Sequence, residues 1–240
     1  MDHEPLRVAS AFPDPPFEVP GEPPSGLDIE LVRAIADELG RPYEQHRYEG
    51  ADFEGIYSGL AAGRYDLVAS GATITPHRRT LARFCAPYLQ SGQSLVVDVE
   101  LSPGIHSTAD LHGSIIGVQD GNTSQPVAER LHAEGAVAGV KVYAYDEILK
   151  ALDDVGNGTI AAFMKLEPVM RWLTRDRPSL SVVQTGITTE LIALAVRSDD
   201  EPLAAAVERA QQSLAARGEL RRLGERWLGD SDPAATRMVT

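Results

Sequence analysis

The chain lacks several features that would assign a class at once. It has one cysteine, Cys85, so no internal disulfide can form, and no CxxC pair exists. No stretch reaches the roughly 18 consecutive apolar residues that a membrane-spanning helix needs. The six histidines show no metal-ligand spacing. P-loop, GxGxxG and GxSxG motifs are missing as well. We therefore predict neither a metal nor a cofactor.

Basic residues are scarce relative to acidic ones. There are 22 lysines and arginines against 35 aspartates and glutamates, a formal net charge of −13. This field repels a phosphate backbone, so we expect no nucleic-acid partner. The acids are spread along the chain, a pattern typical of a solubilising surface. The 240 residues, 43% of them hydrophobic, are typical of a folded protein with one large or two small domains.

The N-terminus has no signal-peptide pattern. Met1 to Pro5 carries neither a basic region nor an apolar run. The chain is therefore expected to be either cytosolic or the processed form of an exported protein, and the resemblance described below favours the second.

Strand-like and helix-like segments alternate along the chain. Apolar runs predict strands at 6–11, 43–48, 66–70, 95–99, 114–118, 140–143, 160–164, 180–183 and 191–196. Helical spacing predicts helices at 27–39, 56–62, 123–132, 146–152, 168–173 and 201–228, the last broken near Gly218. The alternation, in two sets that meet near residue 100, indicates two α/β lobes with parallel sheets. We expect a frayed end over 229–240.

Loops that follow strands are the candidate binding elements, because ligands of open α/β sheets bind beyond the carboxyl ends of the strands. Four loops qualify, at 12–17, 70–78, 119–124 and 165–167. Each carries polar or charged side chains, or a glycine. We therefore expect the ligand to lie among these four loops.

The loop from Ser70 to Arg78 is the most informative. Gly71 allows a close approach of backbone to a ligand. Thr73 offers a hydroxyl and an N–H group. Thr75 and Pro76 are typical of a helix N-cap and first turn, which places Arg78 beside the loop. An arginine there can hold a carboxylate with two parallel hydrogen bonds, unless it simply pairs with a surface acid.

A second candidate loop joins a strand, a glycine turn and a helix start. It runs from Gln119 to Ser124 and contains Gly121, Asn122 and Thr123. Its N–H groups and hydroxyls can hold an anion at the positive end of the helix dipole. Ordinary N-capping by Asn122 or Thr123 is the alternative.

The order of motifs along the chain is more specific than any one of them. The motifs are Leu6-Arg7-Val8, Pro15-Pro16-Phe17, Gly26-Leu27-Asp28-Ile29, Phe53-Glu54-Gly55-Ile56, Gly63-Arg64-Tyr65-Asp66-Leu67, Thr73-Ile74-Thr75-Pro76-His77-Arg78, Pro87-Tyr88, Ser91-Gly92, Gly117-Val118-Gln119-Asp120-Gly121, Gly218 and Trp227-Leu228-Gly229. In this order they resemble the bacterial extracellular solute-binding proteins of the polar amino-acid type. The resemblance covers residues 6–229.

The resemblance implies an α/β, two-lobed periplasmic-binding-protein-like (type II) fold. Lobe 1 would comprise residues 1–95 and 190–240, and lobe 2 the inserted residues 96–189. Two strands would cross between the lobes, near Ser94–Asp98 and near Thr188–Ile192. The ligand would bind in the cleft and close it by a hinge motion. A membrane permease with an ATPase would then accept the closed form.

The resemblance also implies a set of ligand-binding residues. Arg78 matches the arginine that binds the α-carboxylate of the ligand. The further positions are Ser70, Gly71 and Thr73 in lobe 1, Phe12 in the first loop, Phe53 as an apolar wall, Gln119 as a lobe 2 contact, and Asn122 with Thr123 at the helix start that meets the same carboxylate.

Three positions depart from the family pattern. Ala11 stands where an aspartate is common, and Asp14 where an aromatic residue is common. Lys165 falls on the lobe 2 acid that usually binds the ligand ammonium, an arrangement that repels an ammonium. A small shift in alignment would instead place Glu167 in that role.

Two interpretations of the ligand remain open at this point. In the first, Arg78 and Lys165 face each other and bind a ligand with two acidic groups. In the second, Asp14 or Glu167 takes the ammonium, and Lys165 binds a side-chain acid or pairs with Glu190. Simpler alternatives make Lys165 a surface residue and Asp14 a cap of the proline-rich turn.

The expected function is capture of a small carboxylate ligand for import by an ABC transporter. The ligand would be an amino acid or a relative, dicarboxylates included. We expect a non-enzymatic monomer in the periplasm or outside the cell, with lipid anchoring left open. One alternative is a cyclohexadienyl-dehydratase-like enzyme with Lys165 and Glu167 as acid and base. Another is the sensing domain of a larger receptor. Cys85 is expected to be buried and inert, Trp172 and Trp227 to be packing residues, and His77 to be a solvated residue of the first helical turn.

Overall fold

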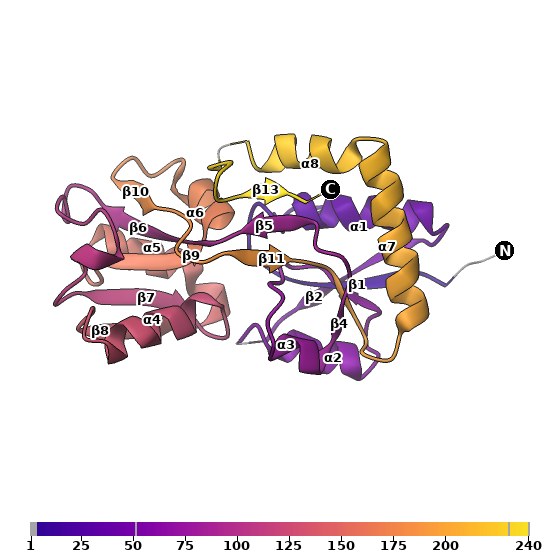
Figure 1. Cartoon of the computed structure of the whole chain (residues 1–240), viewed down its shortest axis with the longest axis horizontal. Helices are drawn as coiled ribbons and strands as arrows, with labels where there is room; N and C mark the ends of the chain where they lie inside the picture. The colour runs from indigo at the N-terminus through magenta and orange to yellow at the C-terminus, as the bar shows by residue number, and fades with distance from the viewer. Residues whose placement is uncertain (1–3, 51, 230, 240) are drawn as a thin grey trace.

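Two five-stranded sheets, each in its own lobe, organise the computed structural model, which describes residues 4–50, 52–229 and 231–239 (Figure 1). The first sheet has the order β2-β1-β3-β12-β4, with β1 Leu6–Ala11, β2 Tyr43–Tyr48, β3 Leu67–Val68, β4 Arg83–Phe84 and β12 Ala195–Val196. The second has the order β10-β6-β9-β7-β8, with β6 Gln93–Asp98, β7 Ile115–Gln119, β8 Gly139–Tyr143, β9 Ala162–Leu166 and β10 Leu180–Gln184. The predicted α/β fold with two lobes is confirmed. The predicted parallel sheets are both mixed instead, because β12 in the first lobe and β6 in the second pair antiparallel with their neighbours.

Parallel pairing puts the carboxyl ends of several strands at one edge of each sheet. In the first lobe β1 lies parallel to both β2 and β3, so that Val8 is opposite Gln45 on one side and Leu67 on the other. In the second lobe β7 lies parallel to β8 and β9. The loops that follow β1, β3 and β7 are three of the four that the sequence marks as candidate binding elements.

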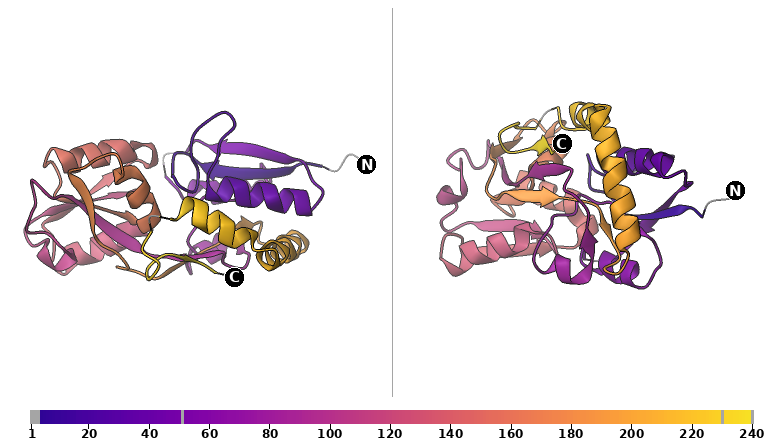
Figure 2. Two further views of the ribbon diagram at one scale, coloured as in Figure 1. Left: turned by 90° about the horizontal axis from the view of Figure 1, so that it is seen from above. Right: turned by 45° about the vertical axis from the view of Figure 1, so that its right-hand side comes forward.

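Helices cover the sheets of both lobes. The first lobe has α1 Leu27–Glu38, α2 Gly55–Ala61, α3 Arg78–Leu81, α7 Glu201–Ala216 and α8 Glu219–Trp227. The second has α4 Ser124–Ala133, α5 Ile148–Gly156 and α6 Glu167–Thr174, together with the short 3-10 helices η1 Thr108–Asp110 and η2 Tyr145–Glu147. The chain breaks between α7 and α8 at Gly218, whose φ of 72° suits glycine. The left view of Figure 2 shows α7 and α8 with the first lobe, where both contact α1.

A small third sheet joins the lobes. It has the order β11-β5-β13, formed by β11 Glu190–Ile192, β5 Leu89–Ser91 and β13 Arg237–Met238 (Figure 1). The two linking segments run close together at Gly92, where an added Cβ would lie 2.0 Å from the carbonyl oxygen of Thr188. The first crossing lies just before the predicted Ser94–Asp98, because β6 already belongs to the second sheet. The division at 95/96 and 189/190 remains our prediction.

Two predictions about the C-terminal part are wrong. The expected strand over 191–196 is split, because β11 pairs with β5 while β12 turns into the first sheet. The end predicted to fray is instead tied down, since Arg237 and Met238 pair with β5 and Thr236 is buried. Asp230 and Thr240 lie outside the described residues.

Cys85, Trp172 and Trp227 pack as predicted, and His77 is exposed as predicted. Cys85 is buried, and burial raises the pKa of its thiol to about 12. The rings of Trp172 and Trp227 lie 5.7 Å apart and join α6 to α8. His77 is exposed beside Glu54. In the described part of the chain, no helix is both long and apolar enough to span a membrane.

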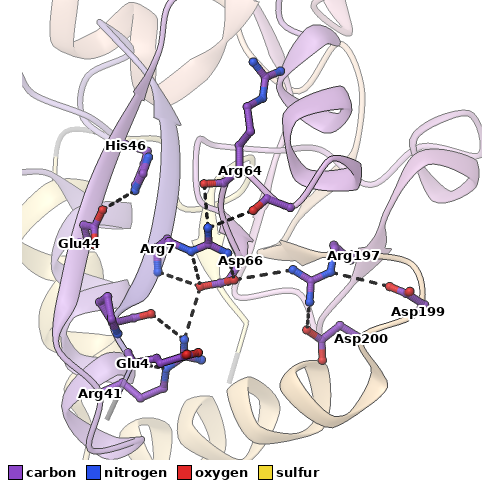
Figure 3. A network of polar contacts seen from close by, with 12 residues as sticks. Glu4, Arg7, Arg41, Glu44, His46, Arg64, Asp66, Arg197, Asp199 and Asp200 are labelled. Carbon is purple, nitrogen blue, oxygen red and sulfur yellow. Dashed lines mark hydrogen bonds and ion pairs between the residues drawn. The ribbon is translucent and has the colours of Figure 1, made fainter. Parts of the chain in front are cut away.

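An arginine cluster around Asp66 fastens the ends of the first-lobe strands away from the binding loops (Figure 3). Asp66 accepts hydrogen bonds from Arg7 at 2.7 Å and from the Arg7 backbone at 3.1 Å. Arg41 and Arg197 lie 3.4 and 3.6 Å from its carboxylate. Burial raises the pKa of Asp66, but the hydrogen bonds and charge of Arg7 outweigh burial and hold the pKa below its ordinary value. The cluster links segments before β2, in β1, before β3 and after β12.

We expect Asp66→Asn to lower the free energy of unfolding by about 1–2 kcal/mol, because three arginines lose their shared anion. Since the pKa of Asp66 is lowered on folding, its contribution is present above the ordinary pKa and is lost as the pH falls through the folded value. Urea unfolding at pH 7 and pH 3 measures both effects. Asp199→Asn, at the exposed edge of the same cluster, is the control. A loss at pH 7 no larger than in the control would contradict the assignment.

Candidate ligand-binding cleft

Arg78 lies at the boundary between the lobes and is 3% exposed. Its Nε donates to Oε1 of Glu54 at 2.7 Å, and its Nη1 donates to the carbonyl oxygen of Thr73 at 3.2 Å, both in the first lobe. Its Nη2 donates to the carbonyl oxygen of Gly121, in the second lobe, at 2.9 Å. The guanidinium therefore contacts both lobes at once. The alternative of an ion pair with an acid is met in part, because Arg78 pairs with the partly exposed Glu54 while its own guanidinium is buried.

The local structure explains why this guanidinium is held in place. The Thr75 hydroxyl accepts a hydrogen bond from the Arg78 backbone N–H at 3.1 Å, as a cap would, although α3 begins at Arg78 rather than at Pro76. The guanidinium carbon lies 4.7 Å from the ring centre of Phe53 and 5.9 Å from that of Tyr57. Stacking on aromatic faces favours a planar cation and limits its motion.

Glycine at position 121 permits the close approach of the lobes. Its φ is 70°, and an added Cβ would lie 3.1 Å from the backbone nitrogen of Phe53 in the other lobe. The ring of Phe53 also lies 5.7 Å from that of Tyr145 in η2. Two lobes therefore meet over Phe53 through backbone and aromatic contact.

Hydroxyls from both lobes converge on Glu190 at the start of β11. Its Oε2 accepts from the hydroxyls of Thr73 and Thr123 at 2.6 and 2.8 Å. Its Oε1 accepts from Gln93 Nε2 at 2.8 Å and from the Thr188 hydroxyl at 2.7 Å. The Thr123 side chain makes no cap hydrogen bond to α4, so the simple capping alternative fails for this residue.

Lys165 forms a buried ion pair across the cleft. Its Nζ lies 2.8 Å from Oδ1 of Asp14 in the first lobe and donates to Oε1 of Gln119 at 2.6 Å. It also lies 5.2 Å from the ring centre of Tyr145. Lys165 is 2% and Asp14 is 4% exposed, so the surface and turn-capping alternatives are wrong. The alternative pairing of Lys165 with Glu190 is not what the structure has.

Burial dominates the electrostatics around this pair. It raises the pKa of Asp14, although the charge of Lys165 opposes the rise. Glu18, fully buried nearby, has a pKa raised well above its ordinary value by burial and by Asp28 and Asp14. The far end of the cleft thus holds one ion pair beside a carboxyl group that favours its protonated form.

Glu167 lies apart from the groups around Lys165. It is fully buried at the start of α6, where Oε1 accepts from Arg171 Nε at 2.9 Å and from the Asp232 N–H at 3.0 Å. Its Oε2 accepts from the Thr236 hydroxyl at 2.9 Å. Glu167 therefore anchors the C-terminal segment, and these contacts correct the expectation that it could face the ligand.

The other predicted residues lie around the same cleft. The Ser70 hydroxyl accepts from the Ala11 N–H at 3.0 Å, and the Gly71 N–H donates to Asp28 at 2.8 Å. Phe12, with Arg47 stacked at 4.7 Å, lines a hollow of about 400 Å³ that Tyr145 also lines. The buried Nδ2 of Asn122 has no hydrogen-bond partner within the described residues. The structure thus brings every predicted site residue except Glu167 to the cleft.

Sequence reasoning missed three residues of the cleft, namely Glu54, Gln93 and Tyr145. It considered Glu190 only as a possible partner of Lys165. Gln93 carried a usable signal, because an amide at the start of a predominantly buried strand needs a polar partner. Glu54 and Tyr145 carried none, since acids and tyrosines are ordinary at exposed helix starts.

Comparison with known proteins agrees with this architecture. Residues 6–230 match the family model of bacterial extracellular solute-binding proteins, family 3. The chain belongs to that family. It is 28% identical over 221 residues to the ABC transporter arginine-binding protein 1 of Escherichia coli, covering 89% of this chain and 86% of the relative.

Solved structures of solute-binding proteins superpose on most of this family member. An ancestral arginine-binding protein bound to arginine gives a TM-score of 0.85 at 29% identity, over 95% of this chain and 100% of that one. An ancestral amino acid-binding protein, described as a precursor of cyclohexadienyl dehydratase, gives 0.81 at 28% identity, over 92% and 94%. The predicted two-lobed binding-protein fold and the predicted solute-binding function are confirmed.

Asp28 supports the Gly71 loop from below the cleft. It accepts hydrogen bonds from the Gly71 N–H and from the Tyr88 hydroxyl. Burial raises the pKa of Asp28 to about 7, against an ordinary value of 3.8. Folding therefore favours proton uptake at this carboxyl group between those two values.

We expect the free energy of unfolding to fall as the pH rises from about 4 to about 7, because the unfolded chain releases this proton first. Asp28→Asn keeps the shape of the side chain and an acceptor for the Gly71 N–H. It should reduce the fall in the free energy of unfolding between pH 5 and pH 8 by an amount on the order of 1–3 kcal/mol. Urea unfolding at pH 5, 6, 7 and 8 measures the slope. Asp37→Asn, exposed on the same helix, should leave the slope as it is in the wild type. Equal slopes in the wild type and Asp28→Asn would contradict the prediction.

Proposed function

We propose that this protein captures an amino acid, or a close chemical relative with one carboxylate at Arg78, and presents it to the membrane permease of an ABC importer. It would act in the periplasm or outside the cell as a monomer, whether or not a lipid holds it to the membrane. The observation that carries the proposal is the placement of Arg78 between the lobes.

The chemistry of Arg78 suits a carboxylate. A guanidinium has five N–H donors in one plane. The contacts to Glu54, Thr73 and Gly121 use three of them within the described residues, so that two remain for a ligand. Charge-assisted hydrogen bonds in a closed, water-poor cleft are strong and directional. A carboxylate bound here would touch the same side chain that contacts both lobes, which links binding to closure.

The ion pair of Lys165 with Asp14 favours an amino acid over a dicarboxylate. Asp14 balances Lys165 at 2.8 Å as Glu54 balances Arg78 at 2.7 Å, so both cations have an acidic partner among the described residues. An amino acid with no net charge therefore adds less uncompensated charge to the cleft than a dicarboxylate does. A relative named for arginine binding and an ancestral structure bound to arginine support an amino-acid ligand.

The proposal is non-enzymatic. A dehydratase reaction of the kind considered above would need Lys165 and Glu167 to face one substrate. Lys165 contacts Asp14 and Gln119, whereas Glu167 contacts Arg171 and the C-terminal segment. This separation favours binding over catalysis. If the protein were instead the sensing domain of a larger receptor, it would bind its ligand in the same cleft.

We expect one or more of the twenty L-amino acids to raise the melting temperature of the wild type, since a ligand that binds only the folded state stabilises it. For that amino acid, calorimetry should show that Arg78→Ala weakens binding about 100-fold or more, because a buried charge-assisted contact is lost. Arg130→Ala, an exposed arginine on α4, should change affinity less than about threefold. Unchanged affinity in Arg78→Ala, or no shift with any amino acid, would count against the proposal.

A further inference from the structure

We infer that Glu190 is the acid that receives the ammonium group of the ligand. This inference rests on the proposed amino-acid function and names a residue that determines its specificity. It is carried by the position of Glu190, by its partners and by the charges around it.

Glu190 lies where both lobes and both linking segments meet. Thr73 belongs to the first lobe and Thr123 to the start of α4 in the second. Gln93 begins β6, and Thr188 lies in the returning link. All four donate to a side chain in a residue that is 7% exposed. A group bound at this carboxylate would therefore lie beside residues of both lobes and of both linking segments.

The carboxylate of Glu190 has neutral partners only. Its donors are the hydroxyls of Thr73, Thr123 and Thr188 and the side-chain amide of Gln93. In the part of the chain that the structure describes, Glu190 takes part in no ion pair. A buried carboxylate without a cation is costly, since neutral donors replace only part of its lost hydration. A ligand ammonium would supply the missing charge.

The other carboxylates of the cleft are already compensated. Glu54 pairs with Arg78 at 2.7 Å, and Asp14 pairs with Lys165 at 2.8 Å. Burial raises the pKa of Glu18 well above its ordinary value, which favours its neutral form. Of Glu54, Asp14 and Glu190, only Glu190 has no cationic partner within the described residues.

Arg78 and Glu190 are both neighbours of Thr73. The carbonyl oxygen of Thr73 accepts from Arg78 at 3.2 Å, and the hydroxyl of the same residue donates to Glu190 at 2.6 Å. Thr73 therefore contacts both the cation and the anion, and a ligand that lies against Thr73 meets both charged groups. The ligand would lie against Thr73, with its carboxylate toward Arg78 and its ammonium toward Glu190.

The surroundings of Glu190 can admit a further donor. A hollow of about 550 Å³ is lined by Glu190 together with Thr73, Thr123 and Thr188. A threonine hydroxyl that donates to a carboxylate can turn and accept from an ammonium. The ammonium can therefore replace hydroxyl donors at Glu190 and bond to the same hydroxyls.

The test compares one amino acid with its α-hydroxy acid, which keeps the carboxylate and side chain and lacks the ammonium. The probe is the L-amino acid that gives the largest rise in melting temperature with the wild type. Calorimetry should give a wild-type preference for the amino acid of about 50-fold or more. In Glu190→Gln the preference should fall below about fivefold, mainly through weaker binding of the amino acid.

Two matched variants complete the design. Glu100→Gln, an exposed glutamate in the turn after β6, should keep the wild-type preference. Asp14→Asn tests the competing acid at the far end of the cleft. An unchanged preference in Glu190→Gln, or a collapse of the preference in Asp14→Asn alone, would overturn the inference.

The outcomes separate this inference from the proposed function. If no amino acid binds the wild type, the proposed function fails and the inference fails with it. If an amino acid binds through Arg78 and the preference survives in Glu190→Gln, only the inference fails. Should Glu190→Gln not fold, Glu190→Asp keeps the charge on a shorter side chain. Its preference should drop at least about fivefold, and a wild-type preference in that variant would equally overturn the inference.

Discussion

A buried guanidinium shared by two lobes is the contact on which the rest of the cleft depends. Arg78 donates to Thr73 in its own lobe and to Gly121 in the other, while Glu54 balances its charge. Burying a cation is costly without such partners. The neighbouring features follow from this need, because the capping threonine, the stacked rings and the glycine turn all hold Arg78 where both lobes can reach it.

Charge compensation explains how this family member accommodates Lys165. The position matches one where the resemblance implies an acid, and a lone buried ammonium there would be unstable. Asp14, itself a departure from the pattern, lies 2.8 Å away and restores neutrality. Asp14 and Lys165 thus balance each other across the cleft, and Glu190 provides a carboxylate at another point of the same cleft.

The backbones of the two linking segments between the lobes lie close together. Gly92 brings the two linking segments together, and β13 adds a third strand beside them. Hydrogen bonds at Glu190 join the same links to both lobes. A motion at the hinge and an event in the cleft therefore act on the same few residues.

The sequence by itself determined the alternation of strands and helices, the two lobes, and the loops that carry Arg78, Thr73 and Thr123, because these follow from local periodicity and turn chemistry. Only the tertiary structure decided which acid meets which base. Asp14 and Lys165 lie 151 positions apart in the chain and in different lobes, and Glu167, two residues from Lys165, points to the C-terminal segment instead. The split of 191–196 into two sheets and the pairing of Arg237 and Met238 with β5 are likewise long-range. Local patterns carry no information about such contacts, because their free energy comes from burial and charge compensation between segments that meet only in the folded chain.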